Sequence, residues 1–262
     1  MTMQASSTPG SPVVSLRGIG KLFSTGTVAL DGFDLDIRSG EFISLLGPSG
    51  CGKSTALRII AGLSGPTKGT VMWQSGKPRP HSIGFVFQEP TLMPWSTVFD
   101  NVFLPLRLAG QPRAAMTKRV MESLGQVGLA DFAQSYPREL SGGMKMRVSI
   151  ARALVTDPSL LLMDEPFAAL DEITRFKLND DLMALWRALG KTVVFVTHSV
   201  FESVYLSQRV VVMTARPGRV AGILAIDAPN RDAHFRTSAE YAGFCRLVSE
   251  ALGRAMHTEA AA

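Results

Sequence analysis

A short apolar strand that runs straight into a glycine-rich loop constrains this chain more than any other feature. Phe42–Leu46 is almost entirely apolar, as expected of a strand buried on both faces of a sheet. The next residues match the pattern G-x-x-x-x-G-K-[ST], and a helix is predicted over Lys53–Leu63. Glycines let backbone N–H groups wrap phosphates without Cβ clashes, and the start of the helix attracts anions. The predicted phosphate-binding loop is Gly47, Pro48, Ser49, Gly50, Cys51, Gly52, Lys53, Ser54 and Thr55.

Two side chains of this loop have their own expected tasks. Lys53 supplies the positive charge that bound phosphates need, and Ser54 supplies a hydroxyl that suits a Mg²⁺ ion. The loop by itself leaves kinases, GTPases and motor proteins open.

Strands and helices alternate along most of the remaining chain, which indicates a mostly parallel, doubly wound sheet. Before the loop, Ser15–Phe23 and Phe33–Ile37 are expected in a half-exposed antiparallel layer. The other predicted strands are Gly69–Trp73, Ile83–Phe87, Leu160–Met163, Thr192–Thr197, Val210–Ala215 and Val220–Ile226, and the predicted helices are Asp171–Leu189, Ser199–Ser207 and Ser238–Leu252. We expect an α/β fold of the P-loop NTPase type, with a RecA-like core, an antiparallel β subdomain and a helical insert subdomain.

Local signals predict where helices begin and end. Between residues 97 and 155 the pattern is helical, with breaks expected at Pro105, at residues 110–112 and at Tyr136 with Pro137. Ser199 and Glu202 are spaced as a capping box at a helix start. The predicted layout is a flexible leader at 1–12, a single ATPase domain at 13–230 and a helical tail at 231–262. Within the domain we expect β subdomain and core at 13–90, helical subdomain at about 91–156 and core at 157–230.

Further motifs resemble those of one known family. Leu140–Gly143 resembles the signature sequence of ATP-binding-cassette ATPases, and Leu160–Pro166 resembles their second nucleotide motif. Gln88, Ala168–Asp171 and His198 follow the order of that family. The resemblance covers residues 15 to 226, and it implies an enzyme that hydrolyses ATP with Mg²⁺.

The resemblance implies roles for the polar residues around the loop. Asp164 holds Mg²⁺ together with Ser54 and Gln88. Glu165 activates the attacking water as general base, and Gln88, His198 and Lys53 act with it on the terminal phosphate.

Other positions of the resemblance concern the adenine and a second subunit. Phe23 matches the aromatic that stacks on adenine, although a core phenylalanine fits a strand end equally well. Asp171 is a binding residue of the family and also a natural helix N-cap. The family forms a head-to-tail homodimer in which Ser141, Gly142 and Gly143 close over the ATP of the other subunit. Met144 stands where many members have glutamine.

Cysteine usage and charge place further limits. Cys51 and Cys245 are too few for a disulfide framework, so we expect free thiols. Because Cys51 lies at a helix start, its thiol pKa is expected to fall and bulky thiol reagents to inhibit unless ATP protects. The net charge of +5 suits nucleic acid and an anionic membrane surface equally well.

The resemblance narrows to one group of transporters. Residues 87–101 and Ala215–Arg219 resemble the ATPase subunits of nitrate, sulfonate and taurine importers. It implies ATP hydrolysis coupled to transport, integral-membrane permease subunits as partners, an external substrate-binding protein as an indirect partner, and no nucleic acid. No apolar run reaches the roughly 20 residues of a spanning helix, so we expect a soluble and cytoplasmic chain. The resemblance to importer subunits implies a peripheral place on the cytoplasmic face of the cell membrane.

Three questions stay open at this point. The apolar residues Leu92–Trp95 form either a docking patch for the permease or internal packing of the insert. The rival functions are a soluble cassette ATPase acting on nucleic acid, ribosomes or cofactor assembly, and a nucleotide-gated switch that barely hydrolyses. The cargo is not encoded in any motif of this chain.

Overall fold

The computed structural model describes residues 12–76, 81–228, 231–232 and 234–257 of the 262-residue chain. The predicted leader therefore lies outside the described residues except for Pro12, which already begins the first strand. The strands are β1 (Pro12–Leu22), β2 (Val28–Arg38), β3 (Phe42–Leu46), β4 (Lys68–Trp73), β5 (Ile83–Val86), β6 (Leu160–Asp164), β7 (Thr192–Thr197), β8 (Arg209–Met213) and β9 (Val220–Ala225). The helices are α1 (Lys53–Ile60), α2 (Val98–Leu108), α3 (Arg113–Gln126), α4 (Gly142–Leu154), α5 (Glu172–Leu189), α6 (Val200–Leu206) and α7 (Ala239–His257), with 3₁₀ turns at Ala130–Phe132, Pro137–Glu139 and Phe235–Thr237.

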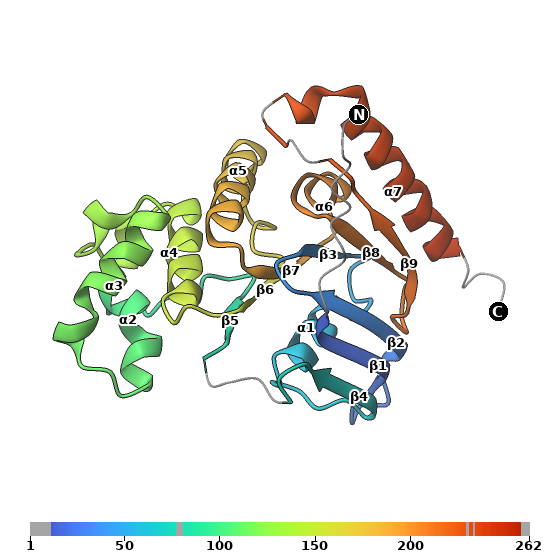
Figure 1. The fold of residues 1–262 in the computed structure, drawn as a ribbon, viewed down its shortest axis with the longest axis horizontal. Helices are drawn as coiled ribbons and strands as arrows, with labels where there is room; N and C mark the ends of the chain where they lie inside the picture. The colour runs from blue at the N-terminus through green and yellow to red at the C-terminus, as the bar shows by residue number, and fades with distance from the viewer. Residues whose placement is uncertain (1–11, 77–80, 229–230, 233, 258–262) are drawn as a thin grey trace, which may run out of the picture.

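The strands of the described residues form two sheets. One is a three-stranded antiparallel sheet with the order β2-β1-β4, and the other has six strands in the order β5-β6-β7-β3-β8-β9. In the larger sheet every pairing is parallel except that of β8 with β9. Figure 1 shows the two sheets at the centre, with α1 between them.

The central strands of the larger sheet are apolar because both of their faces are covered. In β3, Phe42 and Leu46 point into the apolar core built with α4, α5, α6 and α7. Ile43 and Leu45 point to the opposite side, into the core shared with α1 and the antiparallel sheet. Alternate side chains of one strand thus bind two layers together.

The helices α2, α3 and α4 build an apolar cluster of their own to one side of the sheets, and α4 also contacts β5 (Figure 1). The break predicted at Pro105 is wrong, since α2 continues through this residue. Val102, Phe103 and Leu106 are buried on either side of it. Their packing outweighs the loss of one backbone hydrogen bond, so the proline does not end the helix.

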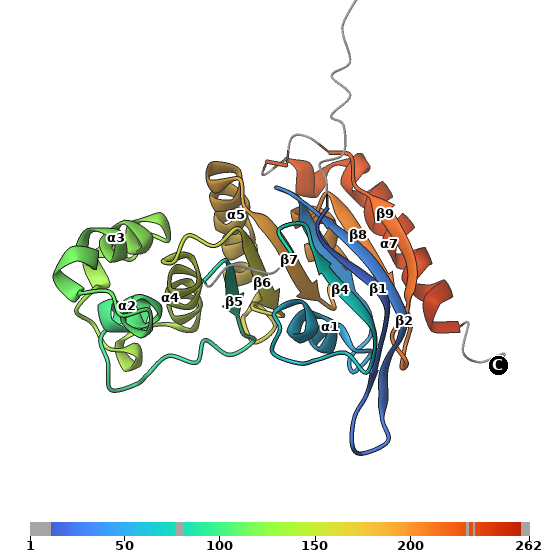
Figure 2. The same ribbon diagram turned by 60° about the horizontal axis from the view of Figure 1, so that its bottom comes forward.

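The carboxy-terminal segment closes one side of the core. Figure 2 shows α7 running along β9 and β8, and it also packs against α6. Arg231 is 5% exposed and donates to the carbonyl oxygens of Ala228, Tyr205 and Ile226. Burial lowers the pKa of Arg231 to about 10, so the guanidinium stays charged at neutral pH and three carbonyls serve as its partners.

The helix start at Ser199 differs from the expected capping box. Ser199 Oγ accepts a hydrogen bond from the backbone N–H of Glu202, as a cap does. The carboxylate of Glu202, however, accepts from the hydroxyl of Thr197 and does not return to the backbone of Ser199. Glu202 is 8% exposed, because α6 packs against the core and turns this side chain inward.

Candidate nucleotide site

The predicted phosphate loop lies between the end of β3 and the start of α1, as the sequence indicates. Gly52 is the N-cap of α1 with φ of 105°, a conformation that L side chains rarely adopt. A Cβ at Gly52 would approach the carbonyl oxygen of Ala29 to 2.6 Å. Only glycine therefore fits at this point, where the loop meets β2.

The loop borders a cavity of about 380 Å³. Its lining includes the predicted residues Phe23, Ser49, Gly50, Gly52, Lys53, Ser54, Thr55, Gln88 and Glu165, together with Thr27, Ala29 and Arg216. The rest of the loop, Gly47, Pro48 and Cys51, does not line it. Nine of these lining residues were predicted from the sequence, and Thr27, Ala29 and Arg216 were not.

Lys53 stands at the centre of the polar groups. Its side chain is 4% exposed, and Nζ donates to the carbonyl oxygens of Gly47 at 2.8 Å and Pro48 at 3.0 Å. The same Nζ lies 3.5 Å from a carboxylate oxygen of Glu165. A buried cation thus faces both the loop and the carboxylate that follows β6, and its charged N–H groups can form strong hydrogen bonds to anionic oxygens.

Two oxygen donors lie side by side next to this lysine. Ser54 Oγ donates to Asp164 Oδ1 at 2.7 Å. Burial raises the pKa of the Asp164 carboxyl, against the opposing effect of the Ser54 hydrogen bond. A hydroxyl and a desolvated carboxylate form a donor set of the kind that suits Mg²⁺, with room for ligands from phosphates and water.

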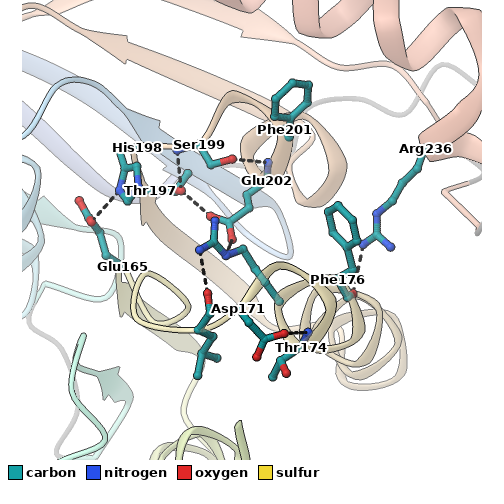
Figure 3. A network of polar contacts seen from close by, with 12 residues as sticks. Glu165, Asp171, Thr174, Phe176, Thr197, His198, Ser199, Phe201, Glu202 and Arg236 are labelled. Carbon is teal, nitrogen blue, oxygen red and sulfur yellow. Dashed lines mark hydrogen bonds and ion pairs between the residues drawn. The ribbon is translucent and has the colours of Figure 1, made fainter. Parts of the chain in front are cut away.

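Glu165 and His198 are brought together from different strands. His198 Nδ1 lies 2.9 Å from Glu165 Oε2. Glu165 has φ of 45°, unusual for a residue with a side chain, and its N–H bonds to the carbonyl of Val196 on β7 at 3.1 Å. Such backbone strain costs on the order of 1–3 kcal/mol and persists where the surroundings hold it in place. Figure 3 shows the two side chains meeting at this edge of the sheet.

The structure places Phe23 and Asp171, each of which had two possible roles in the sequence. Phe23 is 42% exposed and lines the cavity, so the alternative of a core phenylalanine is wrong. Asp171 is the N-cap of α5 and accepts from the N–H of Thr174 at 2.9 Å. That hydrogen bond lowers the pKa of the Asp171 carboxyl.

The signature segment lies away from the cavity of its own chain. Ser141 is the N-cap of α4 and accepts from the backbone N–H of Met144. A Cβ at Gly143 would approach Thr174 of α5 to 2.9 Å, and one at Gly142 would approach Leu170 to 3.2 Å. The glycines therefore let the start of α4 pack closely on the segment around Asp171, outside the cavity lining.

The expected fall in the pKa of Cys51 is wrong. Cys51 is 1% exposed, and a Cβ on Gly47 would lie 2.9 Å from its sulfur. Burial raises the pKa of this thiol, and the nearby Lys53 opposes the shift without reversing it. Cys51 belongs to the apolar core that includes residues of β3 and β8, and it does not line the cavity. Cys51 and Cys245 are both free and buried.

Arg216 is the cation that the sequence analysis missed in the cavity. It lies just after β8, and its guanidinium donates to the carbonyl oxygen of Gly50 through Nε at 3.1 Å and Nη2 at 3.0 Å. Its neighbour Arg219 turns elsewhere and pairs with Asp31. The signal for it in the sequence is the Ala215–Arg219 segment, which by itself indicates the family and not a contact with the phosphate loop.

A sequence profile described as ABC transporter matches residues 30–168, which is more than half of the chain. The chain belongs to the ABC transporter family. It is therefore an ATP hydrolase whose reaction is coupled to transport. The helices described here include none that is long and apolar enough to cross a bilayer.

Relatives of this ABC ATPase agree with the assignment. An uncharacterized ABC transporter ATP-binding protein of Methanocaldococcus jannaschii is 49% identical over 84% of this chain and 82% of its own. The aliphatic sulfonates import ATP-binding protein SsuB of Bacillus licheniformis is 44% identical over 82% of this chain and 86% of its own.

Solved structures show the same fold. The dimeric ATP-binding cassette MJ0796, in a post-hydrolysis state bound to ADP and Pi, matches with a TM-score of 0.71 and 36% identity, covering 82% of this chain and 99% of that one. The cbiO1 protein of Clostridium perfringens, part of the ABC transporter complex cbiONQ, matches with a TM-score of 0.76 and 27% identity, covering 95% and 99%. The predicted P-loop ATPase fold is confirmed.

We expect Cys51 to resist thiol reagents in the folded protein. In a Cys245→Ser variant at pH 7, a bulky maleimide should label Cys51 at least about 100-fold more slowly than in urea, because the thiol is buried and mostly protonated. The rate is followed by mass spectrometry with and without ATP. Rapid labelling that ATP suppresses would show instead that the thiol faces the cavity.

We expect Arg216→Ala to weaken ATP binding and to spare turnover. Removing this guanidinium should raise KM for ATP about three- to tenfold, with kcat within about twofold of the wild type. Arg219→Ala is the matched control, since Arg219 pairs with Asp31 and does not line the cavity. A steady-state phosphate-release assay measures both. Equal KM values for the two variants would remove Arg216 from the binding site.

Proposed function

We propose that this chain is the ATP-hydrolysing subunit of an importer for a small nutrient, of the nitrate, sulfonate or taurine type. The observation that carries the proposal is the cluster of Lys53, Ser54, Asp164, Glu165 and His198 at one edge of the sheet. The similarity to SsuB proteins, which are named for aliphatic sulfonate import, favours this group. Within the group the cargo class is a small organic or inorganic anion or a related nutrient.

ATP fits the cavity through contacts at both of its ends. The adenine stacks on the exposed ring of Phe23, beside Lys21, whose Nζ lies 5.5 Å from the ring centroid. The phosphates lie on the backbone N–H groups of residues 49–55, with Lys53 as their buried counter-charge. Arg216 adds a second positive charge above Gly50.

Mg²⁺ is proposed between the nucleotide and the end of β6. Ser54, Asp164 and Gln88 are the residues that hold it, and Gln88 lines the same cavity. The ion neutralises charge on the phosphate oxygens when it is bound. Asp164, whose carboxyl pKa is raised by burial, would be held as a carboxylate by such an ion.

Glu165 and His198 are proposed to act on the attacking water and the terminal phosphate. Glu165 takes a proton from the water, because its carboxylate faces the cavity beside Lys53. His198 contacts the other oxygen of this carboxylate and orients it, while its Nε2 remains to hydrogen-bond the terminal phosphate. A lone structural histidine would not explain the placement of this pair at the cavity edge.

A homodimer completes the site in this proposal. Ser141, Gly142 and Gly143 begin α4 outside the cavity of their own chain, and Asp171 lies next to them. They are proposed to contact the ATP of a second copy, as the dimeric arrangement of MJ0796 allows. Backbone N–H groups at the start of α4 supply the contact, so Met144 in place of glutamine does not remove it.

The loop after Gln88 is the proposed contact with the permease. Asn101 is buried and binds the backbone of Met93, Ser96 and Thr97, which fixes the shape of this loop. Leu92 packs against the helical cluster, but Trp95 is 76% exposed at the tip. The loop therefore combines internal packing with a rigidly held apolar side chain, which suits docking to a membrane subunit.

This docking places the chain on the cytoplasmic face of the membrane as a peripheral subunit. The cbiO1 neighbour is likewise part of a transporter complex. An external substrate-binding protein would then act through the permease and not through a direct contact.

Glu165→Gln should keep ATP binding and lose turnover. We expect kcat to fall at least about 100-fold, because the amide cannot accept the proton of water. With the reaction blocked, ATP should hold the variant as a closed dimer in size-exclusion chromatography, while the wild type stays mostly monomeric. Hydrolysis at the wild-type rate would rule out Glu165 as the base.

Co-purification tests the transporter assignment directly. A tagged chain, isolated from native membranes in mild detergent, should bring a polytopic permease with it, as identified by mass spectrometry. Trp95→Ala should lose the permease and retain its own binding of ATP. Leu108→Ala is the control, since Leu108 is also 76% exposed but lies at the end of α2. Recovery of a soluble complex or nucleic acid instead would favour a soluble cassette ATPase.

A further inference from the structure

Glu202 is a buried carboxylate that none of the roles above uses. It lies in the first turn of α6, four residues after His198, with 8% of its surface exposed. Burial raises the pKa of its carboxyl, and the hydroxyl of Thr197 and the charge of Arg175 oppose the shift. A buried carboxylate is costly unless a partner compensates it, so its partners indicate why it is there.

One oxygen of Glu202 holds the residues that flank His198. Oε2 accepts from Thr197 Oγ1 at 2.6 Å, and Thr197 Oγ1 in turn accepts from the N–H of Ser199 at 3.0 Å. Ser199 Oγ accepts from the N–H of Glu202 at 3.3 Å, which closes the ring (Figure 3). The backbone on both sides of His198 is therefore anchored to one carboxylate.

The other oxygen of Glu202 faces α5. Oε1 lies 3.7 Å from Arg175 Nε, and Arg175 Nη2 donates to the carbonyl oxygen of Leu170 at 2.9 Å. Leu170 directly precedes Asp171, so the chain of contacts leads from His198 to the segment next to the signature glycines. Neither Oε1 nor Nε has a hydrogen-bond partner among the described residues, so the ion pair is their main compensation.

We propose that Glu202 and Arg175 are a positioning pair that couples the His198 segment to the Asp171 segment. This inference rests on the proposed function, in which His198 contacts the terminal phosphate and Asp171 lies on the face toward the second copy. The pair sets the position of His198 through Thr197 and Ser199, and that of Asp171 through Leu170. Displacement of one segment by nucleotide is then passed to the other.

A second set of contacts also joins α5 and α6. The packing of these two helices therefore does not depend on the Glu202–Arg175 pair alone. Tyr205 donates to Asp180 at 2.5 Å, and Arg236 pairs with Asp180 at 2.9 Å while lying 3.7 Å over the ring of Tyr205. Arg236 also donates to the carbonyl of Phe176. These contacts do not reach Leu170 or Ser199, which makes Arg236 a matched control.

The experiment compares Glu202→Gln, Arg175→Met and the double variant with Arg236→Gln. Glu202→Gln and Arg175→Met should each lower kcat about tenfold and keep KM for ATP within about twofold, because the nucleotide cavity is untouched. The double variant should lose no more than the worse single variant, since both changes break the same link. Arg236→Gln should lower Tm and keep kcat.

A second readout separates coupling from loosened packing. In a Glu165→Gln background, Glu202→Gln should require at least about fivefold more ATP for half-maximal dimer formation, as followed by size-exclusion chromatography. Arg236→Gln in the same background should not change this concentration. This measurement depends on closure of the dimer and not on the chemical step.

Three results with these variants, and a fourth with the wild type, would overturn the inference. Unchanged kcat and dimer formation in Glu202→Gln would show that the pair positions nothing. If Glu202→Gln and Arg236→Gln had the same Tm and lost the same share of kcat, the Glu202–Arg175 pair would contribute only ordinary packing. If the losses of kcat in the two single variants added up in the double variant, Glu202 and Arg175 would act independently. Absence of hydrolysis in the wild type would refute the proposed function itself and the inference with it, whereas normal wild-type hydrolysis confines any failure to the pair.

Discussion

The candidate site depends on the parallel pairing of β6, β7 and β3, in this order, within a sheet covered on both faces. In the observed register Leu46 lies beside Thr197, and Asp164 lies beside Val196. All three strands therefore end at the same edge, and the phosphate loop, the Asp164–Glu165 pair and His198 follow directly from those ends. Burial of the apolar side chains on both faces keeps the register from slipping, because a shift by one residue would turn them to the wrong layer.

The charged side chains at this edge of the sheet compensate one another through ion pairs and hydrogen bonds. Lys53 is buried against the loop carbonyls and Glu165, and Ser54 supports Asp164. Glu202 and Arg175 repeat the same principle one layer further from the cavity. In each case a charged side chain that is costly to bury is compensated by a partner on another element. The ion pairs and hydrogen bonds therefore connect segments that are distant in sequence. The proposed catalytic residues and the proposed positioning pair are therefore held by the same kind of contact.

Local structure followed closely from local patterns. Phe42–Leu46 and Thr192–Thr197 are strands with the predicted ends, and α5 ends at Leu189 as predicted, followed by Gly190 in a left-handed conformation. These elements were predictable because apolar periodicity and glycine conformations act over a few neighbouring residues. Three predictions were wrong: a helix break at Pro105, a lowered pKa for Cys51 and a return hydrogen bond from Glu202 to Ser199. All three errors concern side chains whose surroundings come from other elements.

The sequence by itself determined the phosphate loop, the order of the motifs and the identity of the polar residues at the strand ends. The tertiary structure alone decided which of them share a cavity. It placed Arg216 over Gly50, turned Cys51 into the core and separated the signature glycines from the cavity of their own chain. The physical reason is that burial and ion pairing depend on distances between segments, and those distances exist only after the sheets and helices have packed.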